Sequence, residues 1–145
     1  MTQERKELLL KDLCARLPYG VKCKVSYNSG VINDVDATLY GMDKDGFLMF
    51  DEISGNHREF LCKPYLFPLS SITEEQRYEI SSGLQNIHTE HPPFGKIENS
   101  GSDNCLECVT MASTWLIEYY NKNQLDYNGL INKGLAIDAT GLNIY

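Results

Sequence analysis

The sequence lacks any long apolar run. No stretch approaches the roughly 20 consecutive apolar residues that span a bilayer, so we expect no membrane partner. Residues 1–11, MTQERKELLLK, carry charges where a secretory signal would need an apolar segment. The chain has 5 Cys and no such signal, which favours free thiols in a reducing cytoplasm over a disulfide framework. A cytoplasmic location is therefore predicted.

Familiar catalytic motifs are missing as well. The chain contains neither a G-x-S-x-G sequence nor a phosphate-cradling glycine loop. His57 stands alone in an expected strand or turn, where we interpret it as structural. An active site assembled from distant residues would leave no local trace, so the enzyme hypothesis stays open. We favour a non-enzymatic protein without a cofactor.

Basic residues are scarce, because 13 Lys and Arg stand against 20 Asp and Glu, for a net charge of −7. Residues 1–27 are the exception, with six basic and three acidic side chains. A nucleic-acid binder needs a basic face, since neutralising phosphates supplies most of its affinity. That face would use Arg5, Lys6, Lys11, Arg16, Lys22 and Lys24. We favour the interpretation that they solvate a helix and a strand, and keep nucleic-acid binding by the N-terminal helix as an alternative.

What the sequence does contain is typical of a folded domain. It has 145 residues, 42% of them hydrophobic, which is enough to bury a core. Residues 4–17 predict a helix whose apolar stripe follows three- and four-residue spacing and comprises Leu9, Leu10, Leu13, Cys14 and Leu17. Pro18 lacks a backbone donor and disfavours helical geometry before it, so the helix should end there.

Short strands separated by turns are predicted between Gly20 and Ile72. Residues 21–27 alternate apolar and polar side chains, and Asn28-Ser29-Gly30 is typical of a tight turn. Further strands are expected at 31–41, 47–50, 57–63 and 66–72, with Pro64 and Pro68 at an edge or a corner. The N-terminal helix should then cap a small five-stranded antiparallel barrel or a strongly bent sheet.

The second half is expected to be helical. Thr73 and Gln76 form a capping box for a helix that runs to about Ile87 and should bury Tyr78, Ile80, Leu84 and Ile87. A second helix should span about 105–121, and its apolar side comprises Val109, Ala112, Leu116 and Tyr119 or Tyr120. A loop is expected at about 88–104, and a short helix at 127–133 before an extended end. The predicted class is α+β, with a barrel part at 1–72 and a helical part at 73–145 packed as one domain.

The sequence shows two resemblances to known groups of proteins. The order of elements over residues 8–72 resembles the Sm-like and SH3-like barrels, although the RNA-binding positions of Sm-like proteins have no match here. Residues 17–23, 63–71 and 126–136 resemble segments of short uncharacterised proteins carried by phages and mobile elements of gut anaerobes. The second resemblance implies a cytoplasmic accessory protein and transfers no catalytic residue.

The most specific chemical pattern is His88-x2-His91 followed by Cys105-x2-Cys108. Two His and two Cys at such spacings can complete a tetrahedral zinc site. Cys105 and Cys108 at a helix start also have the layout of a dithiol redox site. Exposed loop histidines and half-buried cysteines explain the same residues without a metal. Gly41–Gly46 partly mimics a calcium loop, but a hairpin turn accounts for it.

Three functional hypotheses follow. The leading one is a non-enzymatic interaction or adaptor module of a phage or mobile element, which binds a protein partner or associates with itself through apolar and aromatic surface. The second is a small zinc-binding or thiol-redox protein that uses His88, His91, Cys105 and Cys108. The third is nucleic-acid binding through the basic N-terminal helix.

Overall fold

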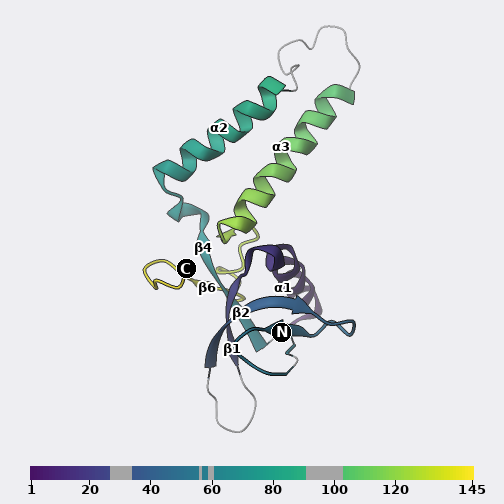
Figure 1. Cartoon of the computed structure of the whole chain (residues 1–145), viewed down its shortest axis with the longest axis vertical. Coiled ribbons are helices and arrows are strands. Elements are labelled where there is room, and N and C mark those ends of the chain that lie inside the picture. The colour runs from purple at the N-terminus through teal and green to yellow at the C-terminus, as the bar shows by residue number, and fades with distance from the viewer. Residues whose placement is uncertain (27–33, 56, 59–60, 91–102) are drawn as a thin grey trace. The chain divides into compact units, whose positions relative to one another are not determined.

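The computed structural model describes residues 1–26, 34–55, 57–58, 61–90 and 103–145 (Figure 1). The chain divides into two compact units. We call Met1–Ser71 together with Gln124–Tyr145 the sheet unit, and Ile72–Asn123 the hairpin unit. No helix in the part of the chain that is described combines the length and apolar character needed to cross a membrane.

The structure confirms the helix that was predicted at the N-terminus. Helix α1 spans Gln3–Arg16, and the Thr2 hydroxyl caps it by accepting a hydrogen bond from the Arg5 amide at 3.4 Å. Leu9 and Leu13 are fully buried, as expected for the inner stripe of an amphipathic helix. The chain leaves α1 through a short 3-10 turn, η1 (Leu17–Tyr19), which contains Pro18.

The sheet is open and mixed. Its strand order is β3-β2-β1-β4-β5, with β6 also paired to β4. The pairs β3–β2, β2–β1 and β1–β4 are antiparallel, whereas β5 and β6 both run parallel to β4. The strands are β1 (Lys22–Ser26), β2 (Asp34–Met42), β3 (Leu48–Phe50), β4 (Cys62–Pro68), β5 (Leu125–Asp126) and β6 (Ile137–Asp138).

The predicted five-stranded antiparallel barrel is therefore wrong. The two expected strands at 57–63 and 66–72 are replaced by the single strand β4, and His57 makes only an isolated bridge to Leu48. The remaining edge of β4 is occupied by β5 and β6 from the C-terminal segment, so the sheet does not close on itself. Strands of two residues carry no alternation that a sequence pattern can reveal.

The core of the sheet unit lies between α1 and one face of the sheet. Cys23 pairs with Ala37 on one side and with Pro64 on the other, which places their side chains on the same face. All three residues are buried. The C-terminal segment completes this core with Leu130, Leu135 and Ala136.

Strand β4 changes partners in its middle. Cys62–Pro64 pair with β1, whereas Tyr65–Leu66 pair with β6 and Phe67–Pro68 with β5. Pro64 was expected at an edge or corner, but β4 lies inside the sheet. Pro64 marks the position where the ladder to β1 ends, which suits a residue without a backbone donor.

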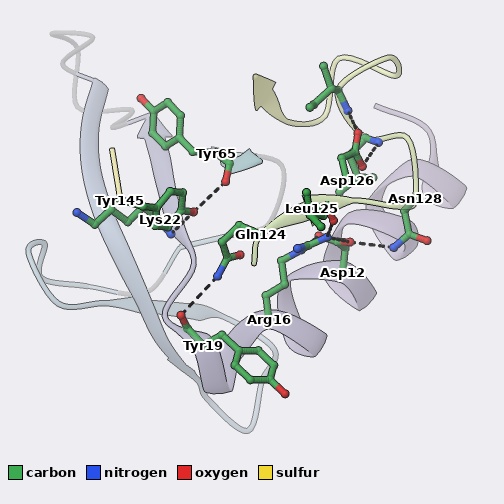
Figure 2. A network of polar contacts seen from close by, with 12 residues as sticks. Asp12, Arg16, Tyr19, Lys22, Tyr65, Gln124, Leu125, Asp126, Asn128 and Tyr145 are labelled. Carbon is green, nitrogen blue, oxygen red and sulfur yellow. Dashed lines mark hydrogen bonds and ion pairs between the residues drawn. The ribbon is translucent and has the colours of Figure 1, made fainter. Parts of the chain in front are cut away.

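The Tyr145 hydroxyl fills the gap that this change of partners leaves. Continuing the β1–β4 register would place Lys22 opposite Tyr65. Instead, the hydroxyl accepts a hydrogen bond from the Lys22 amide at 3.1 Å and donates one to the Tyr65 carbonyl at 2.8 Å (Figure 2). Burial raises the pKa of Tyr145, so the hydroxyl keeps its proton.

The last segment of the sheet unit forms turns where a helix was predicted at 127–133. The Asp126 carboxylate accepts hydrogen bonds from the amides of Leu130 at 2.8 Å and Ile131 at 2.9 Å. Gly129 and Gly134 have positive φ angles of 67° and 69°, a backbone region outside the right-handed helix. The helix prediction is wrong because these local bonds compete with helix formation.

The hairpin unit consists of two antiparallel helices, α2 (Glu74–Glu90) and α3 (Asp103–Lys122) (Figure 1). The predicted capping box is confirmed: the Thr73 hydroxyl accepts a hydrogen bond from the Gln76 amide at 3.2 Å, and the Gln76 side chain accepts one from the Thr73 amide at 3.0 Å. Both helices lie close to the positions predicted from the sequence.

Replacing Tyr145 by Phe tests the bridge between β1 and β4. The substitution keeps the ring but leaves the Lys22 amide and the Tyr65 carbonyl without this partner, which should cost about 1–3 kcal/mol. Urea unfolding followed by circular dichroism measures the loss. Tyr40→Phe is the control, because Tyr40 is 52% exposed. Equal unfolding midpoints for the two variants would show that the hydroxyl does not bridge the strands.

Candidate functional site

A fully buried ion pair lies at the centre of the sheet unit. Asp12 and Arg16 stand four residues apart on α1, on the same side as Leu9 and Leu13. Arg16 donates from Nε to Asp12 Oδ2 at 2.7 Å and from Nη2 to Asp12 Oδ1 at 3.1 Å. Both side chains have no solvent exposure. The contact is therefore bidentate and desolvated, the geometry in which an arginine–carboxylate pair is strongest.

The segment that follows the hairpin unit completes this pair (Figure 2). The Leu125 carbonyl accepts a hydrogen bond from Arg16 Nη2 at 2.9 Å. The Asn128 side-chain amide donates to Asp12 Oδ1 at 2.8 Å. The Tyr127 ring lies 5.5 Å from the guanidinium carbon, within the range of a cation–π contact. A polar network thus joins the first helix to residues 125–128.

This network is structural in character. Its carboxylate accepts bonds from Arg16 and Asn128, and both charged groups are shut away from solvent, so neither can reach a substrate. Because Arg16 is buried, it cannot contribute to the basic face that was predicted to bind nucleic acid. The pair was not predicted from the sequence, although Asp12 and Arg16 fall within the apolar stripe of Leu9 and Leu13. That placement was the available signal.

Three of the four predicted zinc ligands lie within the helices α2 and α3. His88 belongs to the last turn of α2, and Cys105 and Cys108 belong to the first turns of α3. His91 lies outside the described residues, as do the side chains of the other three. Within the described part of the chain, no three His, Cys, Asp or Glu side chains gather in a way that could hold a metal ion. The zinc and dithiol hypotheses stay predictions.

The thiols of the sheet unit are poorly suited to chemistry. Cys14 and Cys23 are free thiols, and Cys23 and Cys62 are buried. Burial raises the pKa of Cys23 well above its ordinary value, with smaller contributions from Cys62 and Asp12. Because the thiolate is the reactive form, Cys23 is protected from acting as a nucleophile.

His57 and the Asp43 turn also have structural explanations. The His57 backbone exchanges hydrogen bonds with Leu48 at 2.7 and 3.0 Å, and its buried ring stands edge-on to Phe50 with centroids 5.9 Å apart. Asp43 Oδ1 accepts hydrogen bonds from the amides of Asp45 at 2.9 Å and Phe47 at 3.0 Å. The carboxylate therefore stabilises the turn itself, as the sequence predicted for Gly41–Gly46.

Helices α2 and α3 contact each other through Glu79 and Gly83 on one helix and Trp115 and Tyr119 on the other. These residues define the contact line of the hairpin. The Tyr119 hydroxyl donates a hydrogen bond to Glu79 Oε2 at 2.6 Å, and burial together with this carboxylate raises the pKa of Tyr119 to about 12. One turn further along, the Trp115 ring lies against Gly83, where any added Cβ would overlap it. The Trp115 and Tyr119 rings stack with centroids 5.5 Å apart.

These contacts fix which way the other side chains point. Successive residues of a helix are about 100° apart, so Ile80, Leu84 and Ile87 flank the contact line on α2. Val109 and Leu116 flank it on α3, and because the helices are antiparallel both flanks turn to the same side. We call these five residues the hairpin face. Val109 is 45% exposed and the other four are half-buried.

The opposite side of the hairpin is mixed. It carries Ser82 on α2 and Thr114 and Glu118 on α3, together with the exposed Tyr78 and Met111. Helical spacing predicted the apolar positions of both helices, but it also predicted that Tyr78 is buried. Tyr78 is in fact 74% exposed, because the contacts of Glu79 and Gly83 with α3 turn it away.

No family model, no curated protein and no solved structure matches this chain. Function must therefore be inferred from the described residues themselves.

Removing one member of the buried ion pair should be far more damaging than removing both. Arg16→Met leaves the Asp12 carboxylate desolvated beside a neutral side chain, at a cost of about 3–5 kcal/mol in the free energy of unfolding. The double variant Asp12→Leu with Arg16→Met should recover most of that loss. Arg5→Met, on the exposed side of α1, is the control. Urea unfolding in which Arg16→Met behaves like Arg5→Met would contradict this account.

Gly83→Ala tests the register of the hairpin. The methyl group would occupy the space of the Trp115 ring, so the helices must separate, at a cost of about 1–3 kcal/mol. Ser82→Ala is the matched control on the opposite side of the same turn. Trp115 is the only tryptophan in the chain, so its fluorescence reports the contact directly. A red shift is expected for Gly83→Ala alone, and identical spectra would refute the register.

Proposed function

We propose that the protein is a non-enzymatic interaction module whose hairpin unit binds a protein partner through the hairpin face. The observation that carries this proposal is the contrast in burial between the two units. Fully buried apolar side chains, such as Leu9, Leu39 and Leu66, come from the sheet unit. Among the described residues of 72–123, none of the apolar side chains is fully buried.

A hairpin of this kind gains stability by covering its apolar face. Short isolated helices are marginal in water, and most helical stability in proteins comes from packing an amphipathic face. Complete burial of an aliphatic side chain is worth about 1.5–3 kcal/mol. The hairpin face holds five such side chains that are exposed or half-buried, so a partner that covers them supplies a substantial free energy of binding.

The chemistry of the sheet unit supports a role in binding rather than catalysis. Its most deeply buried charges, Asp12 and Arg16, neutralise each other, and the pKa of Cys23 is raised. In this proposal the sheet unit is a stable frame that carries the hairpin. We further propose, on the resemblance of its segments alone, that the module is an accessory protein of a phage or mobile element.

Paired charge substitutions on the two sides of the hairpin test the proposed function. The hairpin-face variant Leu84→Glu with Leu116→Glu should retain at least about tenfold less partner, because its carboxylates would have to be buried on binding. The control variant Ser82→Glu with Thr114→Glu places the same charges on the opposite side of the hairpin. Each protein is immobilised and exposed to a cell lysate that also contains an untagged copy of the wild-type chain.

Only a protein that the wild type and the control retain, and the hairpin-face variant loses, supports the proposal. Circular dichroism and Trp115 fluorescence must show that all three baits keep the hairpin folded. If the same proteins, or none, are retained by all three baits, the hairpin face is not a binding surface.

A further inference from the structure

We propose that the sheet unit binds one internal water molecule, which joins Arg16 Nη1 to Gln124 Oε1. Both atoms are buried and have no hydrogen-bond partner among the described residues. Buried polar groups are almost always hydrogen-bonded, in many cases to an ordered water molecule. An unpaired donor and an unpaired acceptor in the same unit therefore point to a ligand. The site lies in the sheet unit and is independent of the function proposed for the hairpin face.

Arg16 and Gln124 belong to one ring of contacts (Figure 2). Arg16 Nη2 donates a hydrogen bond to the carbonyl of Leu125 at 2.9 Å, and Leu125 directly follows Gln124. The side-chain amide of Gln124 donates from Nε2 to the Tyr19 carbonyl at 3.4 Å. Tyr19 ends η1, the short turn that follows Arg16, and so closes the ring. The two unpaired atoms are thus carried by side chains that the same contacts hold together.

The orientation of the Gln124 amide is fixed by this ring. Exchanging its oxygen and nitrogen would set Oε1 against the Tyr19 carbonyl, and two acceptors cannot bond each other. The backbone of Gln124 is held as well, because its carbonyl accepts a hydrogen bond from the Phe67 amide at 2.9 Å. Its φ angle of 54° is uncommon for a residue other than glycine. Oε1 therefore cannot turn to another acceptor site and needs a donor where it stands.

The Tyr127 ring does not replace the proposed ligand. The ring lies 5.5 Å from the guanidinium carbon of Arg16 and can face one of its N–H groups. Nη1 carries two N–H groups, however, so a second one still needs an acceptor. The face of the ring also offers no donor to the oxygen of Gln124. A molecule that bonds both atoms satisfies the donor and the acceptor together.

The chemistry of the two atoms selects a neutral molecule. The guanidinium of Arg16 would repel a cation, and the oxygen of Gln124 would repel an anion. Asp12 already pairs with the charge of Arg16, so no further counterion is needed. The bound molecule must accept a hydrogen bond from Nη1, donate one to Oε1 and be small enough for a buried site. Water meets all three requirements.

Magnetic relaxation dispersion of the solvent oxygen nuclei tests the inference, because it counts water molecules that are held inside a protein. Gln124→Met keeps a side chain of similar length but removes Oε1, so this variant should hold one internal water molecule fewer than the wild type. Asp12→Leu with Arg16→Met removes Nη1 and should lose the same molecule. Combining all three substitutions should therefore cause no further loss. Gln85→Met, at an exposed position of α2, is the control and should keep the wild-type number.

A crystal structure of the wild-type protein gives a second test that needs no substitution. A solvent peak within about 2.7–3.2 Å of both Arg16 Nη1 and Gln124 Oε1 is expected. A direct hydrogen bond between the two atoms, a protein group paired with either of them, or an empty space between them overturns the inference. Equal numbers of internal water molecules in the wild type and in a folded Gln124→Met variant overturn it as well.

Discussion

The buried Asp12–Arg16 pair is the constraint on which the sheet unit depends. It takes a hydrogen bond from Asn128 and gives one to the carbonyl of Leu125, partners that lie 116 and 109 residues away in sequence. Burying two charges is costly unless they are paired and hydrogen-bonded, so the bonds to Leu125 and Asn128 offset part of that cost and tie the first helix to residues 125–128. Arg16 Nη1 is buried without a hydrogen-bond partner among the described residues. The fold is closed by this long-range polar contact as well as by apolar packing.

The hairpin unit interrupts the sheet unit in the sequence. The sheet unit ends at Ser71 and resumes at Gln124, and the strands on either side of this interval are neighbours, since Phe67 of β4 pairs with Leu125 of β5. The hairpin unit is thus an insertion between two adjacent strands. The sheet unit possesses its own core and its own closing contacts, whereas none of the apolar side chains described in the hairpin unit is fully buried.

Local signals in the sequence predicted much of this architecture, and long-range contacts account for what was missed. The stripe of α1, the alternation in β1 and the Thr73–Gln76 capping box depend on neighbours within a few residues, and all three were predicted. Strands β5 and β6 have two residues each, so they carry no periodicity. Their parallel pairing with β4, which replaces the expected barrel by an open sheet, joins residues 58 positions apart for β5 and 72 positions apart for β6.

The same distinction between local and long-range contacts applies to the candidate site. The apolar positions of α2 and α3 could be predicted from helical spacing, but the sequence did not show that they lie on the same side of the hairpin. That side is set by the Trp115 ring against Gly83 and by the Tyr119–Glu79 hydrogen bond, which join distant residues. Burial of Arg16 was also missed, because an arginine beside apolar residues resembles an exposed one until its acceptors on the C-terminal segment are known.

The difference in stability between the two units is the central claim, and amide hydrogen exchange tests it most directly. The amides of α1 and β1 belong to elements that build the fully buried core, so they should be strongly protected, whereas those at 80–87 and 109–116 should exchange markedly faster, because none of the apolar side chains described in the hairpin unit is fully buried. Equal protection of the amides in the two units would contradict the account.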